Sequence, residues 1–495
     1  MSLIDFVASA TGNYITAMPK AQRKSYGQFF TSPETAQFMA QLFDLDDAPS
    51  MVTILDPGAG SGILATALIE CLTQMPKVTA IDLVCYENDP QVLPLLRSNL
   101  AWVKEHCQIE LTYQIKADNY ILSQAAAYND ELGLEADAPK FDLVIGNPPY
   151  CKISKDAPEA QTLPDVCYGA PNLYFLFAAM SLFNLKDSGE LVYIIPRSWT
   201  SGAYFERFRS KFLSQGALEH IHLFVSRDKV FTQESVLQET VIIKVKKTTE
   251  RPECITVSTS QSNGDFSELT SFQVPYRTVV QGPAHYIYLV TNEQEVQTMT
   301  QLSRLTDTLP KLGLKMRTGL TVDYRNQEAL RIHPEAHAVP LFYAHHLKQG
   351  QVQFPQGKEP EYLVTTQKGL LQKNSNYLFV KRFTAKEEPR RLQCAVYLAR
   401  NFPKYTHIST DNKINFICGH NELSESVVYG LYVIFNSTLY DRYYRLLNGS
   451  TQVNATEINA MPVPPLKTIA AMGNALIKGH DLSEAACDQI LMRFI

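Results

Sequence analysis

The first half of the chain alternates short apolar runs with amphipathic stretches. In the amphipathic stretches the apolar residues recur every three or four positions, which predicts helices with one buried face. The apolar runs are bounded by turn-forming residues, which predicts strands. We expect seven strands, at residues 52–56, 82–87, 109–115, 141–146, 190–196, 218–224 and 239–245.

Strands that are apolar throughout and alternate with helices are typical of a doubly wound α/β sheet, buried on both faces. The short link over residues 225–238 favours an antiparallel pair over a further crossover. The sequence therefore predicts a Rossmann-like sheet of seven strands whose last strand is antiparallel. Ligands of such sheets bind beyond the carboxyl ends of the strands, so the residues that follow the strands should meet at one edge.

The second half of the chain is expected to form a separate domain. A polar stretch, residues 256–271, has the composition of a surface loop or a boundary. We therefore divide the chain into residues 1–250 and an α+β domain of residues 251–495, which ends in a helix over residues 482–495.

Composition narrows the class of protein. The chain has 495 residues, of which 45% are hydrophobic, and a net charge of −5, which is typical of a globular protein with several domains. Its nine cysteines form no CxxC pair and no zinc-ligand spacing, so we expect no metal and a reducing cytoplasm. MSLIDF lacks the features of a secretion signal, and the longest apolar run, residues 173–183, predicts a buried helix too short to cross a membrane.

A glycine-rich turn, DPGAGSG at residues 56–62, directly follows the first predicted strand. Glycines let the backbone approach a ligand closely, and the helix that follows offers unpaired backbone amides. Gly58, Gly60 and Gly62 are spaced by two, unlike the G-x-G-x-x-G of nucleotide-dependent dehydrogenases. The alternative is a tight turn with a purely structural role.

Acidic and amide residues follow the next two strands. Glu87, with Asn88 beside it, ends the second strand and can accept hydrogen bonds from both hydroxyls of a ribose. Asp118, with Asn119 beside it, follows the third strand and can accept a hydrogen bond from an adenine amino group. Taken alone, each fits a solvated charge or a turn. Their order, ahead of NPPY at residues 147–150, favours a ligand site.

That order, with GQFFTSPETAQFMA at residues 27–40 ahead of it, resembles the S-adenosylmethionine-dependent amino-methyltransferases of bacterial restriction and modification systems. It is most similar to the gamma arrangement of TaqI-like adenine-N6 DNA methyltransferases, with cofactor motifs first, catalysis second and target recognition last. The resemblance covers residues 26–247 and includes residues 171–177, 189–213 and 228–247. It implies a cytoplasmic enzyme that acts on double-stranded DNA with S-adenosylmethionine as cofactor.

The resemblance also assigns roles to single residues. Thr31 would touch the methionine end of the cofactor, Glu87 would hold the ribose, and Asp118 would hold the adenine. Phe231 would correspond to the aromatic residue that stacks on the target base. The cofactor-binding residues that it implies are Thr31, Asp56, Gly58, Gly60, Glu87, Asn88, Asp118, Asn119 and Asn147.

NPPY, residues 147–150, is the candidate catalytic motif. The lone pair of the adenine amine is delocalised into the ring, so the enzyme must localise it before it can attack a methyl group. The side-chain oxygen of Asn147 and the carbonyl of Pro148 are the two acceptors for the amine hydrogens, and the rings of Pro148 and Pro149 restrict the backbone there. Tyr150 would stack on the base and Phe231 would close the other side. The base must first turn out of the duplex, at a cost of roughly a few kcal/mol.

A basic segment in the second half is the candidate for DNA contact. Residues 368–404 hold nine basic and two acidic residues, a local charge of +7. Within it, Lys381 and Arg382 lie between aromatic residues, and we expect them to contact phosphates. The alternative is a solvated face. Residues 317–326 and 411–422 are also expected near DNA, but their spacing does not show which base they read.

Other functions use the same motifs. A protein-glutamine methyltransferase would use NPPY in the same way, because an amide nitrogen has a similarly delocalised lone pair, but such chains are shorter; an RNA amino-methyltransferase is a further alternative. The chain could also be a DNA-binding specificity component without turnover, against which the intact Asp56, Glu87, Asp118 and Asn147 argue. We expect no fused nuclease and leave open a cognate restriction endonuclease encoded separately.

Overall fold

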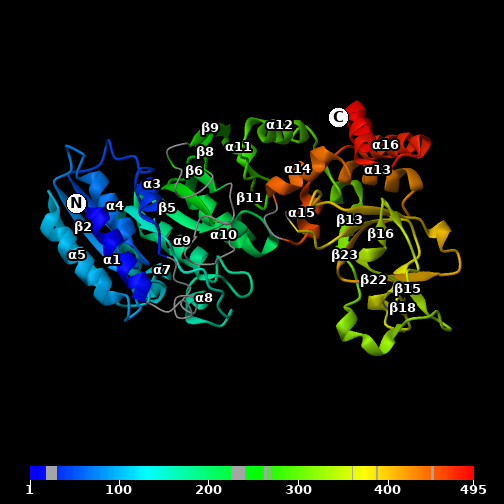
Figure 1. Ribbon diagram of the computed structural model, residues 1–495, viewed down its shortest axis with the longest axis horizontal. Helices are drawn as coiled ribbons and strands as arrows, with labels where there is room; N and C mark the ends of the chain where they lie inside the picture. The colour runs from blue at the N-terminus through cyan, green and yellow to red at the C-terminus, as the bar shows by residue number, and fades with distance from the viewer. Residues whose placement is uncertain are drawn as a thin grey trace. The chain divides into compact units, whose positions relative to one another are not determined.

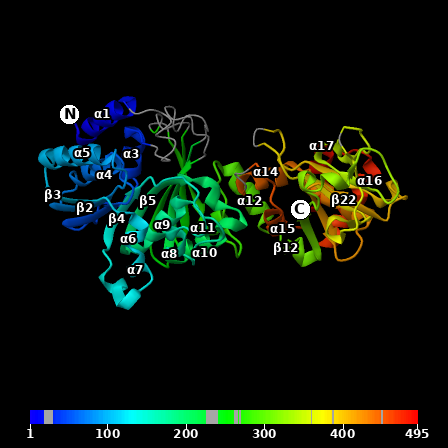
Figure 2. The ribbon, with the colours of Figure 1, turned by 90° about the horizontal axis from the view of Figure 1, so that it is seen from below.

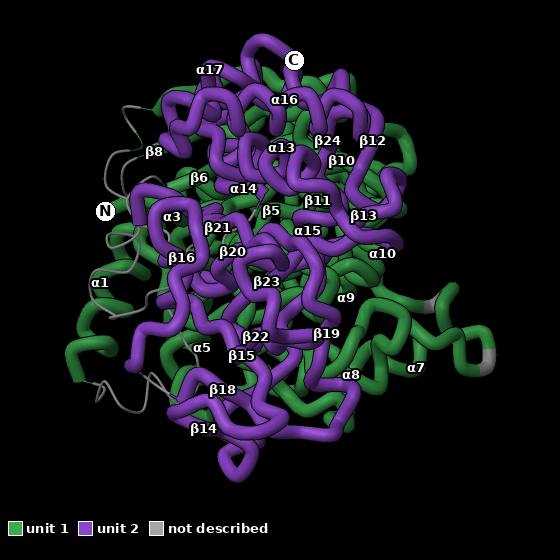
Figure 3. The backbone as a smooth tube through the Cα atoms, turned by 90° about the vertical axis from the view of Figure 1, so that its right-hand side faces the viewer, with its two compact units in different colours: residues 1–291 green, residues 292–495 purple. Residues whose placement is uncertain are grey.

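The computed structural model describes residues 1–17, 30–224, 240–260, 266, 269–358, 360–385, 388–447 and 451–495. The chain forms two compact units, unit 1 (Met1–Thr291) and unit 2 (Asn292–Ile495), coloured separately in Figure 3. Figure 1 traces the path of the chain through both units, each of which is described by itself.

Unit 1 is built on one large sheet. In the described part of this unit nine strands follow the order β3-β2-β1-β4-β5-β7-β6-β8-β9. Strands β1 to β5 are parallel, and β7 runs antiparallel to both β5 and β6, as predicted for the last strand. Their bounds are β1 Met51–Asp56, β2 Ala80–Tyr86, β3 Glu110–Lys116, β4 Phe141–Gly146, β5 Leu185–Pro196, β6 Gly216–Phe224, β7 Thr240–Lys247, β8 Cys254–Ser260 and β9 Thr270–Pro275.

The predicted count of seven strands and the boundary after residue 250 are wrong. Strand β8 pairs with β6 and β9 pairs with β8, so the stretch predicted as a polar loop extends the first sheet, and unit 1 continues to Thr291. The polar residues of β8 are buried because histidines of β6 bond to them. The Ser258 hydroxyl lies 2.7 Å from His220 Nε2, and His222 lies 3.1 Å from the Ser260 hydroxyl. Burial lowers the pKa of His220 to about 4, so this ring is neutral near neutral pH.

Helices cover both faces of the sheet. Figure 2 shows α1, α3, α4 and α5 on one face and α6, α9 and α10 on the other. The apolar faces of the first group pack on the strands, and α9 is the buried helix that the sequence predicts. The bounds are α1 Leu3–Ala17, α3 Pro33–Ala40, α4 Ile63–Leu72, α5 Leu93–His106, α6 Tyr120–Ser123, α7 Ala125–Tyr128, α8 Pro158–Thr162, α9 Leu173–Asn184, α10 Glu206–Gln215 and α11 Tyr276–Val279.

The described part of unit 2 combines two larger sheets and one two-stranded sheet with a group of helices, as expected for an α+β domain. The larger sheets have the orders β13-β23-β20-β21-β17-β16 and β14-β18-β15-β22-β19, and β12 (Asp307–Thr308) pairs with β24 (Pro462–Val463). The strands are β13 Leu314–Thr318, β14 Leu330–Arg331, β15 Val339–Phe342, β16 Leu347–Lys348, β17 Gln351–Val352, β18 Tyr362–Leu363, β19 Gln372–Lys373, β20 Tyr377–Lys381, β21 Cys394–Tyr397, β22 His407–Thr410 and β23 Ile414–Gly419. The helices are α12 Glu293–Leu302, α13 Glu425–Phe435, α14 Thr438–Leu447, α15 Ala455–Ala460, α16 Leu466–Gly479 and α17 Glu484–Phe494.

Helix α17 confirms the helix predicted at the end of the chain. Helices α13 and α16 cross unusually closely, because each presents a glycine to the backbone of the other. A Cβ atom on Gly430 would collide with the carbonyl oxygen of Ile469, and one on Gly473 would collide with that of Ser426. No helix in the described part of the chain combines the length and apolar composition needed to cross a membrane.

Gly430→Ala should therefore destabilise unit 2. Alanine normally stabilises a helix interior by about 1 kcal/mol relative to glycine, but here the added methyl group has no space, and overpacking costs about 1–3 kcal/mol or more. We expect a lower midpoint of urea unfolding. Gly12→Ala is the matched control, because a Cβ atom at Gly12 on α1 meets no atom within 4 Å. Equal stability of Gly430→Ala and the unsubstituted protein would contradict the close crossing.

Candidate functional site

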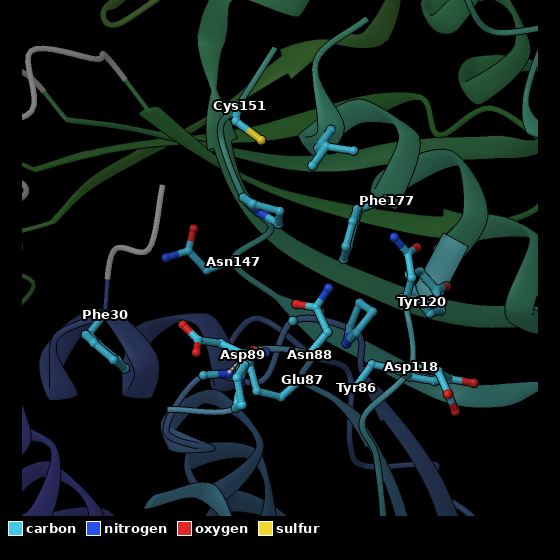
Figure 4. Close-up of a pocket in the computed structure, with 17 residues that line it drawn as sticks. Phe30, Tyr86, Glu87, Asn88, Asp89, Asp118, Tyr120, Asn147, Cys151 and Phe177 are labelled. Atoms are coloured by element: carbon cyan, nitrogen blue, oxygen red, sulfur yellow. Dashed lines mark hydrogen bonds between the residues drawn. The ribbon is translucent and has the colours of Figure 1, made fainter. Parts of the chain in front are cut away.

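A pocket of about 340 Å³ opens at the carboxyl edge of the first four strands (Figure 4). Each strand contributes residues from the turn that follows it, as expected for a doubly wound sheet. Helix α9 adds two apolar side chains, and Phe30 completes the wall. The lining residues are Phe30, Pro57, Gly58, Gly60, Tyr86, Glu87, Asn88, Asp89, Pro90, Asp118, Asn119, Tyr120, Asn147, Pro149, Cys151, Leu173 and Phe177.

Most of the predicted site residues in unit 1 meet at this pocket. Eight of them line it: Gly58, Gly60, Glu87, Asn88, Asp118, Asn119, Asn147 and Pro149. Thr31, Asp56, Pro148 and Tyr150 are not among the lining residues, although Thr31 and Tyr150 contact Asn147 from behind. Phe231 lies outside the described residues.

The side chain of Asn147 is held from both sides. Its Nδ2 donates to the Thr31 hydroxyl at 3.1 Å, and its Oδ1 accepts from the Tyr150 hydroxyl at 2.7 Å. Thr31 precedes α3, far from Asn147 in sequence, so the contact joins the N-terminal segment to the end of β4. These two contacts fix the plane of the amide where β4 ends.

Tyr150 is buried behind Asn147. Its ring packs edge-on against Tyr174, with centroids 6.3 Å apart, and its hydroxyl also lies 3.0 Å from the Ile194 carbonyl. Burial raises the pKa of Tyr150 well above its ordinary value, so the hydroxyl stays protonated and donates to Asn147. Because the ring is not part of the pocket wall here, its stacking role stays a prediction.

The glycine-rich turn is tied to the end of β2. Gly60 and Gly62 have positive φ angles of 54° and 82°, which favour glycine, and a Cβ atom on Gly62 would lie 2.9 Å from Leu96. The backbone N–H of Gly60 donates to Glu87 Oε2 at 2.9 Å, and that of Asp89 donates to Oε1 at 2.8 Å. The carboxylate of Glu87 is therefore fixed at the pocket wall. Burial raises its pKa.

Asp56 lies beneath this turn and is fully buried. In the described part of the chain, neither of its oxygens has a hydrogen-bond partner of ordinary geometry. Burial raises the pKa of Asp56 to about 7, the charge of Glu87 adds to this, and the backbone amides of Gly58 and Ala65 only partly oppose it. A cationic ligand beside these two carboxyl groups would favour their ionised forms.

Aromatic side chains that no sequence motif indicated form much of the wall. Tyr120 packs against both Tyr86 and Phe177, with ring centroids 5.0 and 5.3 Å apart. Behind the wall, Gln124 donates to the Tyr86 hydroxyl at 2.9 Å, and the Tyr120 hydroxyl donates to Asn184 at 2.8 Å. A purine ring can stack on aromatic faces of this kind. Tyr120 could have been identified as a pocket residue because it directly follows Asp118 and Asn119 in the sequence.

Lys381 and Arg382 lie in unit 2 and are half-buried. The ammonium of Lys381 donates to the Gln393 side chain at 2.7 Å, and Arg382 donates to the Asn412 carbonyl at 3.0 Å. Elsewhere in the basic segment, Arg391 is only 1% exposed. The charge counted from the sequence is therefore not a continuous positive surface, and phosphate contact by Lys381 and Arg382 stays a prediction.

One cluster in unit 2 has residue types that could ligate a metal: His345, His346 and Glu361. The backbone N–H of Tyr343 donates to His346 Nδ1 at 2.9 Å, so the ring proton is on Nε2, which lies 2.7 Å from Glu361. In this arrangement Nε2 has no lone pair to offer a metal. The cluster is therefore a hydrogen-bonded link between two loops.

Comparison with known proteins points to one family. The family model of the Eco57I restriction-modification methylase matches residues 75–231. Type II methyltransferase M.PstI of Providencia stuartii is 33% identical, over 99% of this chain and 96% of its own length. Type II methyltransferase M.BsuBI of Bacillus subtilis is 35% identical, over 94% of this chain and 93% of its own. The cryoEM structure of a DrdV-DNA complex shares the fold, with a TM-score of 0.51, 13% identity, and coverage of 96% of this chain and 60% of that one.

Asp56→Asn should change how stability depends on pH. The folded pKa of about 7 lies above the ordinary value of 3.8, so the folded protein binds this proton more tightly than the unfolded chain does. Stability is therefore lost as pH rises from about 4 to about 7 and is level above that.

Asn cannot ionise, so the variant should gain thermal stability relative to the unsubstituted protein as pH rises from about 5 to about 7. The expected gain in melting temperature is about 4 °C. Differential scanning calorimetry measures this difference, with the exposed Asp47→Asn as control. A difference that stays constant with pH would contradict a protonated Asp56.

Proposed function

Because the chain belongs to the bacterial type II restriction-modification methyltransferases, we propose that it transfers a methyl group to N6 of adenine in double-stranded DNA. Membership rests on the two relatives above 30% identity that match nearly the whole chain. Its cofactor is S-adenosylmethionine, and DNA is the substrate class. The observation that carries the adenine proposal is the carboxamide of Asn147, which lines the pocket where β4 ends.

The residues of the pocket suit S-adenosylmethionine. When bound, this cofactor supplies an activated methyl group on a sulfonium. Glu87 is held by two backbone amides so that its carboxylate can receive the ribose hydroxyls, and Asp118 and Asn119 lie beside the aromatic wall that suits the adenine. Asp56 adds a buried carboxyl group whose oxygens have no hydrogen-bond partner of ordinary geometry in the described part of the chain, so a positively charged ligand would favour its ionised form.

The cofactor roles of the remaining predicted residues are part of this proposal. Gly58, Gly60 and Asn88 line the pocket, where a ligand would meet the glycine turn and the turn after β2. Thr31 reaches the site through Asn147, so we propose that it positions this amide as well as the methionine end of the cofactor.

Asn147 is proposed to act on the target amine. Its Oδ1 and the Pro148 carbonyl would accept the two amine hydrogens, which localises the nitrogen lone pair for attack on the methyl group. Thr31 and Tyr150 support this role because they fix the plane of the amide before substrate arrives. Pro148 and Pro149 restrict the backbone, so the second acceptor is held in a fixed direction.

The target adenine must leave the duplex to reach Asn147, at a cost of roughly a few kcal/mol. Tyr150 and Phe231 are the proposed stacking partners for it. We propose that unit 2 supplies target recognition, with Lys381 and Arg382 as candidate phosphate contacts. A restriction endonuclease encoded separately stays a prediction, as does a cytoplasmic location.

Asn147→Ala should remove methyl transfer and keep cofactor binding. Loss of a positioned polar group that acts in the transition state costs about 10²–10³ in rate, whereas Glu87 and the aromatic wall remain intact. Transfer of tritium from labelled S-adenosylmethionine to bacterial DNA gives the rate, and isothermal titration calorimetry gives the cofactor Kd. Asn129→Ala, at an exposed site in unit 1, is the control. Undiminished turnover in Asn147→Ala would refute the assigned role.

Glu87→Gln should weaken cofactor binding about tenfold to a hundredfold, because it replaces hydrogen bonds to a charged acceptor by neutral ones. The same calorimetric titration measures this change. The control is Glu110→Gln, because Glu110 is exposed at the start of β3, at the opposite edge of the sheet. An unaltered Kd in Glu87→Gln would remove Glu87 from the cofactor site.

A further inference from the structure

The connection between β4 and α9 forms a loop whose base is part of the pocket wall. We call residues 154–170 the rim loop. Cys151 and Leu173 both line the pocket, and the N–H of Leu173 donates to the Cys151 carbonyl at 2.9 Å. One residue further on each side, Lys152 forms a β-bridge with Asn172. The rim loop is therefore anchored at the pocket and projects from the carboxyl edge of the sheet.

The far part of the rim loop presents an aromatic ring beside a guanidinium. Tyr168 is 59% exposed, an unusual state for a large aromatic side chain. Arg207 donates to the Cys167 carbonyl at 3.0 Å, and its guanidinium lies 6.0 Å from the centre of the Tyr168 ring. Arg207 is in the first turn of α10, which starts soon after β5 ends, so it lies at the same edge of the sheet as the pocket.

A second cation reaches the same edge. The ammonium of Lys152 lies 5.8 Å from the centre of the Tyr204 ring. The ring of Tyr204 is fixed in turn, because its hydroxyl donates to the Ala170 carbonyl of the rim loop. Two tyrosines with a cation beside each therefore lie next to the residues that form the pocket wall.

Two acidic residues of the rim loop, Asp165 and Glu159, are occupied by other partners. Asp165 forms an ion pair with Lys211 at 3.0 Å and accepts from the Tyr128 hydroxyl at 3.0 Å. Glu159 accepts from Asn119 at 2.8 Å. In contrast, neither Lys152 nor Arg207 forms an ion pair with any other residue that the structure describes. Their positive charges are therefore available to an external anion.

We propose that Lys152, Tyr168 and Arg207 form a second DNA-contact surface, on unit 1, that holds the duplex beside the target adenine. The proposal rests on the proposed function and adds a contact to those expected from unit 2. Lys152 and Arg207 bind phosphates, and Tyr168 stacks on an exposed base or sugar next to the adenine that has left the helix. Contacts of this kind, made beside the extruded adenine, offset the free-energy cost of removing that base from the duplex.

Arg207→Ala tests the phosphate contact through the dependence of binding on salt. Each phosphate contact contributes about 0.9 to the slope of log K against log salt concentration. Fluorescence anisotropy with a labelled DNA duplex should therefore give a slope smaller by about 1 in Arg207→Ala. Arg207→Lys should retain the slope, because the charge remains.

Arg251→Ala is the matched control. Arg251 is also exposed, its guanidinium also lies 6.0 Å from a tyrosine ring, that of Tyr276, and it also donates to a backbone carbonyl, that of Gly216. Arg251 follows the carboxyl end of β7, which lies at the end of the sheet opposite to the pocket because β7 is antiparallel. Its replacement should leave the slope unchanged.

Tyr168→Ala tests the stacking contact. It should lower kcat/KM for DNA methylation about fivefold or more, and Tyr168→Phe should restore it because the ring remains. The Kd for S-adenosylmethionine should stay unchanged in every variant. An unchanged salt slope in Arg207→Ala, or an equal loss in Arg251→Ala, overturns the proposal while methylation by the unsubstituted protein still stands. Failure of the unsubstituted protein to methylate any DNA overturns the proposed function, and this proposal with it.

Discussion

The site depends on the hydrogen bonds that hold Asn147 where β4 ends. A side-chain amide on a turn can rotate. Catalysis that depends on aligning the reactants requires this amide to keep one orientation. Thr31 and Tyr150 bond to the two ends of the amide, and they come from segments on either side of the glycine turn in sequence. Formation of this geometry therefore requires the N-terminal segment and the sheet to fold together.

Much of the site could be predicted because strand order places it. Parallel strands direct their carboxyl ends to one edge, so residues that follow four different strands, such as Gly58, Glu87, Asp118 and Asn147, converge whatever the details of packing. The aromatic wall was not predicted. Phe177 belongs to a helix that is apolar almost throughout, and sequence periodicity does not show which of its residues faces a ligand.

Distant hydrogen-bond partners explain one wrong prediction and also affect the basic segment. The polar composition of residues 256–271 predicts a loop, but Ser258 and Ser260 are buried in β8 because His220 and His222 bond to their hydroxyls. In the basic segment, whose contact with DNA stays a prediction, Lys381 and Arg382 likewise donate to protein partners. In both cases the hydrogen-bond partner of the polar group is distant in sequence, so local composition cannot predict it.

Every role proposed for the pocket depends on methylation of the exocyclic amine of adenine. The most direct measurement is nucleoside analysis, by liquid chromatography and mass spectrometry, of bacterial DNA incubated with the protein and S-adenosylmethionine. N6-methyladenine should be the methylated base. Methylation confined to cytosine, or transfer to RNA or protein with none to DNA, would contradict it.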